Sequence, residues 1–171
     1  ENSTGEIMRE PRHNIEIENY LPHRAPMLMK CKTPYIDGAS VETHFTITTN
    51  NIFTNSDGEF TEGGLIELAA QTCWTITGQD FFDDDDTKGI GNKVVGYISA
   101  IKKAELFLLP KVGDVLITKG KLINRFDTSE MTMCTISSTT FRNDDLVVDC
   151  TFNFLIHEIS KWKKMKCPQM K

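Results

Sequence analysis

A single carboxylate interrupts the most apolar stretch of the sequence, FTEGGLIELAAQT (60–72). Glu67 stands among leucine, isoleucine and alanine, and burying a charged group is costly unless a partner compensates it. Because Glu67, Gln71 and Thr75 follow one another at intervals of four, they would form one polar stripe on a helix. Glu67 is therefore a candidate catalytic acid or base, with an ion-paired core residue and a solvent-facing residue as the alternatives.

The segment that carries Glu67 is predicted to be a buried helix over about 62–79, since apolar residues cover most of its circumference. Strand-like composition precedes and follows this helix. Runs of strands with one segregated helix indicate the α+β class rather than alternating α/β. We expect a curved antiparallel sheet wrapped around one long central helix, with the sheet edges paired across a dimer. The predicted strands are 27–36, 40–49, 93–108, 113–125, 129–142 and 146–158.

The composition is typical of one globular domain and excludes several classes of protein. A net charge of −5 over 171 residues argues against a nucleic-acid-binding face. Five scattered cysteines, never in C-x-x-C spacing, indicate no zinc site or disulfide framework and favour a reducing compartment. No apolar run approaches the ~18 residues of a membrane span. We therefore expect a cytoplasmic protein without a metal.

Three segments are predicted along the chain: a loosely ordered N-terminal segment at 1–14, a single domain at 15–160, and a basic tail at 161–171. The run of four aspartates at 83–86 reads as a solvated loop. A calcium site is the weaker interpretation, because loops that bind hard cations space their ligands.

Three motifs in the same order resemble the hot-dog fold β-hydroxyacyl-acyl-carrier-protein dehydratases over residues 20–158. YLPHRAPMLM (20–29) is similar to the opening L-P-H-R-x-P-x-L of that family, and GGLIELAAQT (63–72) to its central-helix G-V-L-x-x-E-x-x-A-Q. GYISAIKKAELFLLPKVGDVL (96–116) is similar to its F-x-x-I-x-x-A-x-F strand and P-x-x-P-G-D turn. The resemblance implies a hot-dog fold.

The resemblance also implies dehydration of a (3R)-hydroxyacyl thioester carried on the phosphopantetheine of acyl carrier protein or CoA, with no other cofactor. In this family a His takes the α-proton, and a helix carboxylate from the other protomer handles the departing hydroxyl. The motif match makes Glu67 that carboxylate and Gln71 a supporting residue. Gly63 and Gly64 fall at the helix N-terminus, whose free N–H groups can polarise a thioester carbonyl.

The family's catalytic histidine motif, H-F-P-x-x-P-x-x-P-G, is missing. Phe53 occupies the expected position, fourteen residues before Glu67. His23 and Arg24 belong to the matched L-P-H-R motif, where the family keeps a His that is not the base. We therefore expect His23, Arg24 and Phe53 at the substrate-binding site rather than in the acid–base step.

The other histidines are weaker substitutes for the missing base. His44, in THF, precedes the expected position by nine residues and belongs to a predicted strand. His13 lies in the N-terminal segment, and His157 ends the last strand, where we expect it at the surface. The His-lacking branch of the family, which includes accessory dehydratase-like proteins of aryl-polyene pathways, matches this pattern best.

Three functions follow from this reading. The first is a dehydratase-like protein of fatty-acid or polyketide-type synthesis, active in a homodimer or with a His-bearing hot-dog partner. The second is a non-catalytic module that binds acyl thioesters, and the third is a thioesterase. If Glu67 is structural, Arg24 and Lys30 are its candidate partners. Lysines at 102, 103 and 111 are candidates for docking an acidic carrier protein.

Overall fold

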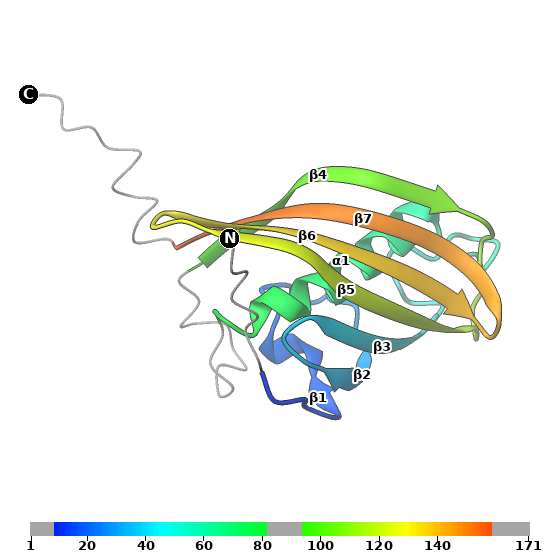
Figure 1. Cartoon of the computed structure of the whole chain (residues 1–171). Helices are drawn as coiled ribbons and strands as arrows, with labels where there is room; N and C mark the ends of the chain where they lie inside the picture. Colours follow the sequence, from blue (N-terminus) through cyan, green and yellow to red (C-terminus); the bar gives the residue numbers. More distant parts are fainter. Residues whose placement is uncertain (1–8, 82–93, 159–171) are drawn as a thin grey trace, which may run out of the picture.

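The computed structural model describes residues 9–81 and 94–158, which form a seven-stranded antiparallel sheet around one long helix, α1 (Figure 1). The strand order is β1-β2-β3-β5-β6-β7-β4. The predicted α+β arrangement is confirmed, and the four-aspartate run and the basic tail lie outside the described residues. The elements are β1 (Ile15–Glu16), the 3-10 turn η1 (Ile17–Asn19), β2 (Lys32–Ile36), β3 (Ser40–Thr46), α1 (Glu62–Gly78), β4 (Val94–Leu106), β5 (Val115–Asp127), β6 (Met131–Arg142) and β7 (Asp145–Glu158).

Helix α1 is enclosed on nearly every side, as its composition predicts. Thr61 caps its N-terminus and its side chain accepts a hydrogen bond from the backbone N–H of Gly64. All residues from Leu68 to Gly78 are buried, and the sheet curves over the helix in Figure 1. The helix ends at Gly78, and Gln79 forms its C-cap.

The long strands present alternate residues to the helix. In β7, alternate side chains from Val148 to Ile156 are buried, as the sequence pattern predicts. Four of the five cysteines are buried and free, as expected for small apolar side chains. These faces and α1 together form the core.

Strand β4 forms one edge of the described sheet, because it pairs with β7 on one side and with no other described strand. Most of its residues are exposed, including the large apolar side chains of Val95, Tyr97, Ile98 and Ile101. An exposed apolar edge strand is a liability, because its unpaired backbone groups can pair with another chain.

Residues 9–14 belong to the segment that the sequence predicts to be loosely ordered. In the described part of it, Arg12 and Ile36 exchange two backbone hydrogen bonds and Arg9 pairs with Asp80. One detail of the sequence prediction is wrong. His157 is not at the surface: it is buried, and its ring stacks on Tyr97 with 6.2 Å between ring centroids. The alternation along β7 predicts an exposed side chain at position 157, but the ring of Tyr97 on the neighbouring edge strand covers it.

Candidate active site

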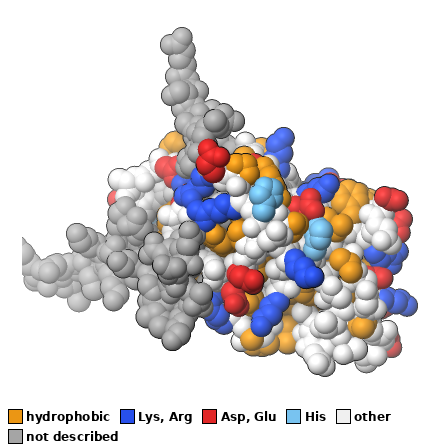
Figure 2. All heavy atoms as spheres, turned by 90° about the horizontal axis from the view of Figure 1, so that it is seen from below, with side chains coloured by type: hydrophobic (Ala, Val, Ile, Leu, Met, Phe, Trp, Pro, Cys, Tyr) orange, Lys and Arg blue, Asp and Glu red, His pale blue; other side chains and the backbone are white. Residues whose placement is uncertain are grey.

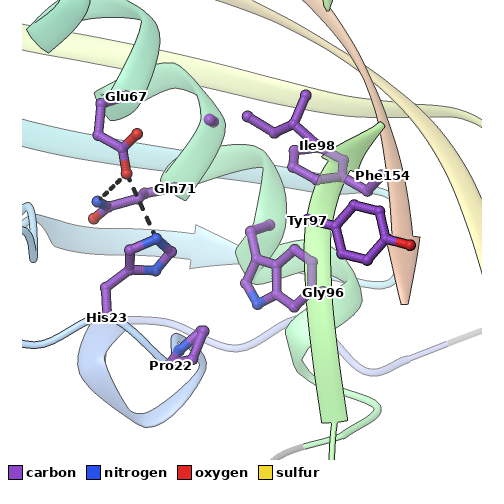
Figure 3. A pocket seen from close by; sticks show the side chains of 10 residues that line it. Pro22, His23, Glu67, Gln71, Gly96, Tyr97, Ile98 and Phe154 are labelled. Carbon is purple, nitrogen blue, oxygen red and sulfur yellow. Dashed lines mark hydrogen bonds and ion pairs between the residues drawn. The ribbon is translucent and has the colours of Figure 1, made fainter. Parts of the chain in front are cut away.

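His23, Glu67 and Gln71 lie together beside the middle of α1 (Figure 3). The Nε2 atom of His23 is 3.5 Å from Oε1 of Glu67, and the Nε2 atom of Gln71 donates a 2.7 Å hydrogen bond to the same oxygen. The side chains of His23 and Glu67 are 32% and 23% exposed, respectively. The carboxylate is thus at the accessible rim of the core, next to an imidazole of the same chain.

Gln71 fixes the segment that follows His23 onto the helix. Its Oε1 accepts a 2.8 Å hydrogen bond from the backbone N–H of Met29, and its Nε2 also donates to the carbonyl of Met27 at 2.8 Å. Gln71 is fully buried. The predicted supporting role of Gln71 therefore has a concrete geometry, since one side chain ties the 23–29 segment to Glu67.

A cavity of about 180 Å³ adjoins the polar residues. It extends between α1, the loop that carries His23, and the edge strand β4 (Figure 3). The cavity is lined by Pro22, His23, Glu67, Ala70, Gln71, Trp74, Gly96, Tyr97, Ile98 and Phe154. The polar pair therefore faces a space with largely apolar walls, in which charges interact more strongly than in water.

The surroundings of His23 favour its neutral form. Burial lowers the pKa of His23 below its ordinary value of 6.5, and the positive charge of Arg24 acts in the same direction, against the opposing effect of Glu67. A neutral imidazole at neutral pH can accept a proton. His23 thus meets the chemical requirement of a general base.

The lowered pKa of His23 predicts that acidification destabilises the fold. Between pH 6.5 and the lower folded pKa, the unfolded chain binds a proton that the folded chain excludes, so the free energy of unfolding rises with pH. This contribution is present above pH 6.5 and is lost as the pH falls through the folded pKa. Denaturant unfolding measured across this pH window should show that the free energy of unfolding depends more steeply on pH in the wild type than in His23→Gln. Equal slopes would contradict the prediction.

Arg24 and Lys30 are the candidate structural partners of Glu67. Arg24 donates from Nη1 to the carbonyls of Leu21 and His23, at 2.7 and 2.8 Å, and so braces its own loop. Lys30 is exposed, whereas the carboxylate of Glu67 lies beside His23. The partner is His23, which sequence reasoning assigned to substrate binding.

Phe53 and the two glycines lie at the N-terminus of α1 and do not line the cavity. A Cβ atom on Gly64 would approach the Cβ of Phe53 to 2.6 Å and the ring of Phe60 to 2.8 Å, so packing requires glycine there. Gly63 is exposed, and a Cβ on it would meet the Phe53 ring at 3.9 Å. A contact of either glycine with substrate stays a prediction.

These two glycines should respond differently to alanine. Gly64→Ala is expected to lower the free energy of unfolding by about 1–3 kcal/mol, because Phe53, met at its Cβ, and the ring of Phe60 must both move. Gly63→Ala has ordinary van der Waals space and should be neutral or stabilising by up to about 1 kcal/mol. Urea unfolding of the two variants checks this, and equal destabilisation would contradict it.

The alternative histidine and the docking lysines are not part of this site. His44 pairs with Glu42 at 2.7 Å on the face of β3 that points away from the buried Val41, Thr43 and Phe45. Lys103 forms ion pairs with Glu105 and Asp149 at 2.9 and 2.8 Å. Figure 2 shows one face on which acidic and basic side chains are interspersed with hydrophobic ones.

Sequence reasoning missed the cavity wall opposite Glu67. Trp74 and Phe154 read as ordinary core residues, and Gly96 to Ile98 read as part of a strand. The third family motif begins at Gly96, so its match was the sign in the sequence that this part of the strand could belong to the site. Among residues 9–81 and 94–158, no group of three potential ligands could hold a metal ion, and no helix is long and apolar enough to cross a membrane.

The fold and this site define a hot-dog protein, and comparison with solved structures confirms the fold. The dehydratase heterocomplex ApeI:P from Xenorhabdus doucetiae matches with a TM-score of 0.70 and 16% identity, over 88% of this chain and 97% of that chain. A sigma28-regulated virulence protein from Campylobacter jejuni matches with a TM-score of 0.56 and 14% identity, over 78% and 79%. A hypothetical thioesterase with coenzyme A from Streptococcus pneumoniae TIGR4 matches with a TM-score of 0.55 and 13% identity, over 79% and 91%.

The family resemblance is confirmed more specifically by the sequence. Residues 15–97 match the model of the ApeP-like family, described as ApeP dehydratase. This segment contains the L-P-H-R loop, α1 and the start of β4, which are the elements that form the candidate site. No curated protein shows significant sequence similarity to the chain.

Proposed function

We propose that the chain is a dehydratase-type protein acting on (3R)-hydroxyacyl thioesters, with His23 and Glu67 as its acid–base pair. The observation that carries this proposal is the 3.5 Å approach of the two side chains at the mouth of a largely apolar cavity. His23 thus replaces, within one protomer, the histidine that the family supplies from the position of Phe53.

The two groups have complementary tasks in the proposed reaction. Neutral His23 takes the proton from the α-carbon. Since the two groups are 3.5 Å apart, the resulting imidazolium passes this proton to the Glu67 carboxylate, which gives it to the departing β-hydroxyl. Water and the trans-2-enoyl thioester result, and both side chains return to their starting state. Gln71 holds Glu67 in place by donating to it.

A second hot-dog subunit is part of this proposal. Gly96, Tyr97 and Ile98 line the cavity from β4, the exposed edge strand, so a subunit that pairs along β4 would lie beside the site. The similar ApeI:P structure is a dehydratase heterocomplex, which supports a heterodimer here. A homodimer is the alternative, and acyl carrier protein in the cytoplasm is the proposed source of the thioester.

The proposal is tested by incubating the purified chain, alone and with a co-expressed hot-dog partner, with (3R)-hydroxyacyl pantetheine thioesters. Enoyl absorbance that depends on His23 and Glu67 is the expected result. Release of free thiol, detected with a thiol reagent, would identify a thioesterase instead. Binding without turnover in either preparation would identify a non-catalytic acyl-binding module.

A further inference from the structure

The cavity extends from the polar pair along α1 to Trp74, the lining residue that follows on the same helix face. Trp74 follows Glu67 by seven residues, so the two lie on the same face of α1, about 10 Å apart along the helix axis. Glu67 is partly exposed, whereas Trp74 is only 4% exposed. The cavity therefore joins an accessible polar side at Glu67 to a buried side at Trp74.

The indole ring is fixed in position by its contact with β4. A Cβ atom on Gly96 would lie 1.6 Å from Cη2 and 2.3 Å from Cζ3 of Trp74, so the ring occupies the space that any side chain at position 96 would need. On its other side the ring meets Phe154 edge-on, with 5.8 Å between ring centroids. Trp74 is thus a rigid wall rather than a movable side chain.

The space in front of this wall is small. At about 180 Å³, the cavity is below the ~300–1,000 Å³ that drug-sized ligands occupy. Beyond the polar pair and Gln71, its walls are Pro22, Ala70, Trp74, Gly96, Tyr97, Ile98 and Phe154. A small, largely apolar cavity beside a fixed ring has room for a short acyl chain and less room for a longer one.

We propose that Trp74 limits the length of the acyl chain that this site accepts, with Gly96 as the residue that allows the indole to take this position. The inference rests on the proposed function only in taking an acyl thioester as the ligand. It makes short-chain acyl thioesters the substrate class, and each methylene that does not fit should cost about tenfold or more in specificity.

The test measures binding of acyl-pantetheine amides, which cannot react, over a series of chains of increasing length. The wild type should bind the short members and reject the long ones. Trp74→Leu should gain affinity for longer chains by about tenfold or more, and Trp74→Phe should shift the limit less. Gly96→Ala should weaken binding of every member, because its methyl group forces the indole out of position.

The matched control is Phe60→Leu, which also truncates a buried ring against α1 but lies at the helix N-terminus and outside the cavity wall. Its length profile should equal that of the wild type. An unchanged profile in Trp74→Leu, an equal shift in Phe60→Leu, or no binding by the wild type would overturn the inference. If Trp74→Leu does not fold, Trp74→Phe and Gly96→Ala decide it.

These results separate the inference from the proposed function. A length limit that depends on Trp74, without enoyl formation by any preparation, would support the acyl site and reject the dehydratase. Enoyl formation with the same length profile in the wild type and in Trp74→Leu would support the dehydratase and reject the length limit at Trp74.

Discussion

Replacing His23 by alanine, or Glu67 by glutamine, is expected to lower kcat/KM for enoyl formation by about 10²–10⁴-fold, the usual loss when a general acid or base is removed. Each substitution removes one of the two groups that exchange the proton, so the remaining group cannot complete the transfer. The free energy of unfolding should change little by comparison, because both side chains are partly exposed. The measurement is the initial rate of enoyl absorbance under subsaturating substrate.

A matched control is available in the same chain. His44 and Glu42 form another histidine–carboxylate pair, 2.7 Å apart, on the face of β3 that points away from the helix. His44→Ala and Glu42→Gln should retain full activity. A comparable loss in these variants would mean that any broken surface pair impairs the protein, and the assignment of His23 would fail.

The pH dependence distinguishes a catalytic imidazole from one that only shapes the loop. Because the pKa of His23 is lowered, the acidic limb of the kcat/KM profile should lie below pH 6.5. If His23→Ala keeps its activity in a complex with a His-bearing subunit, the base comes from the partner. In that outcome Glu67→Gln would still be inactive.

The architecture could be predicted from the sequence because it depends on local periodicity. The alternation of apolar and polar residues in β7 and the apolar circumference of α1 each indicate one element and its buried face. The sheet that covers α1 then follows from the need to bury that helix. Chain order alone does not show that His157 is covered by Tyr97, because the contact joins two strands.

The site could be predicted only in part, for the same physical reason. Glu67 and Gln71 share one helix face, so their spacing reveals their proximity. His23 is 44 residues from Glu67 and reaches it because Gln71 binds the backbone at Met27 and Met29. Such long-range hydrogen bonds leave no periodic pattern in the sequence. The family motif pointed to Phe53 instead, which packs against Gly64.

Gln71→Leu is expected to combine a large loss of stability with a large loss of activity. The leucine removes the partners of the Met29 N–H and the Met27 carbonyl while keeping the site buried. Each unsatisfied buried group costs about 1–3 kcal/mol, so the free energy of unfolding should fall by about 2–6 kcal/mol. Urea unfolding followed by circular dichroism measures this change.

The loss of activity in Gln71→Leu should exceed what partial unfolding explains. Without Gln71 the 23–29 segment is released from α1, and a displacement of about 1 Å at His23 is enough to lower the rate by about 10²-fold. Gln79→Leu is the matched control, since Gln79 is also buried, at the C-cap of α1, and donates to the carbonyls of Asp37 and Ile76, at 2.8 and 3.1 Å. Gln79→Leu should lose stability and keep its kcat/KM per folded molecule, because its contacts lie at the other end of the helix. If both variants lose activity in proportion to the unfolded fraction alone, Gln71 supports the fold and does not position His23 for proton transfer.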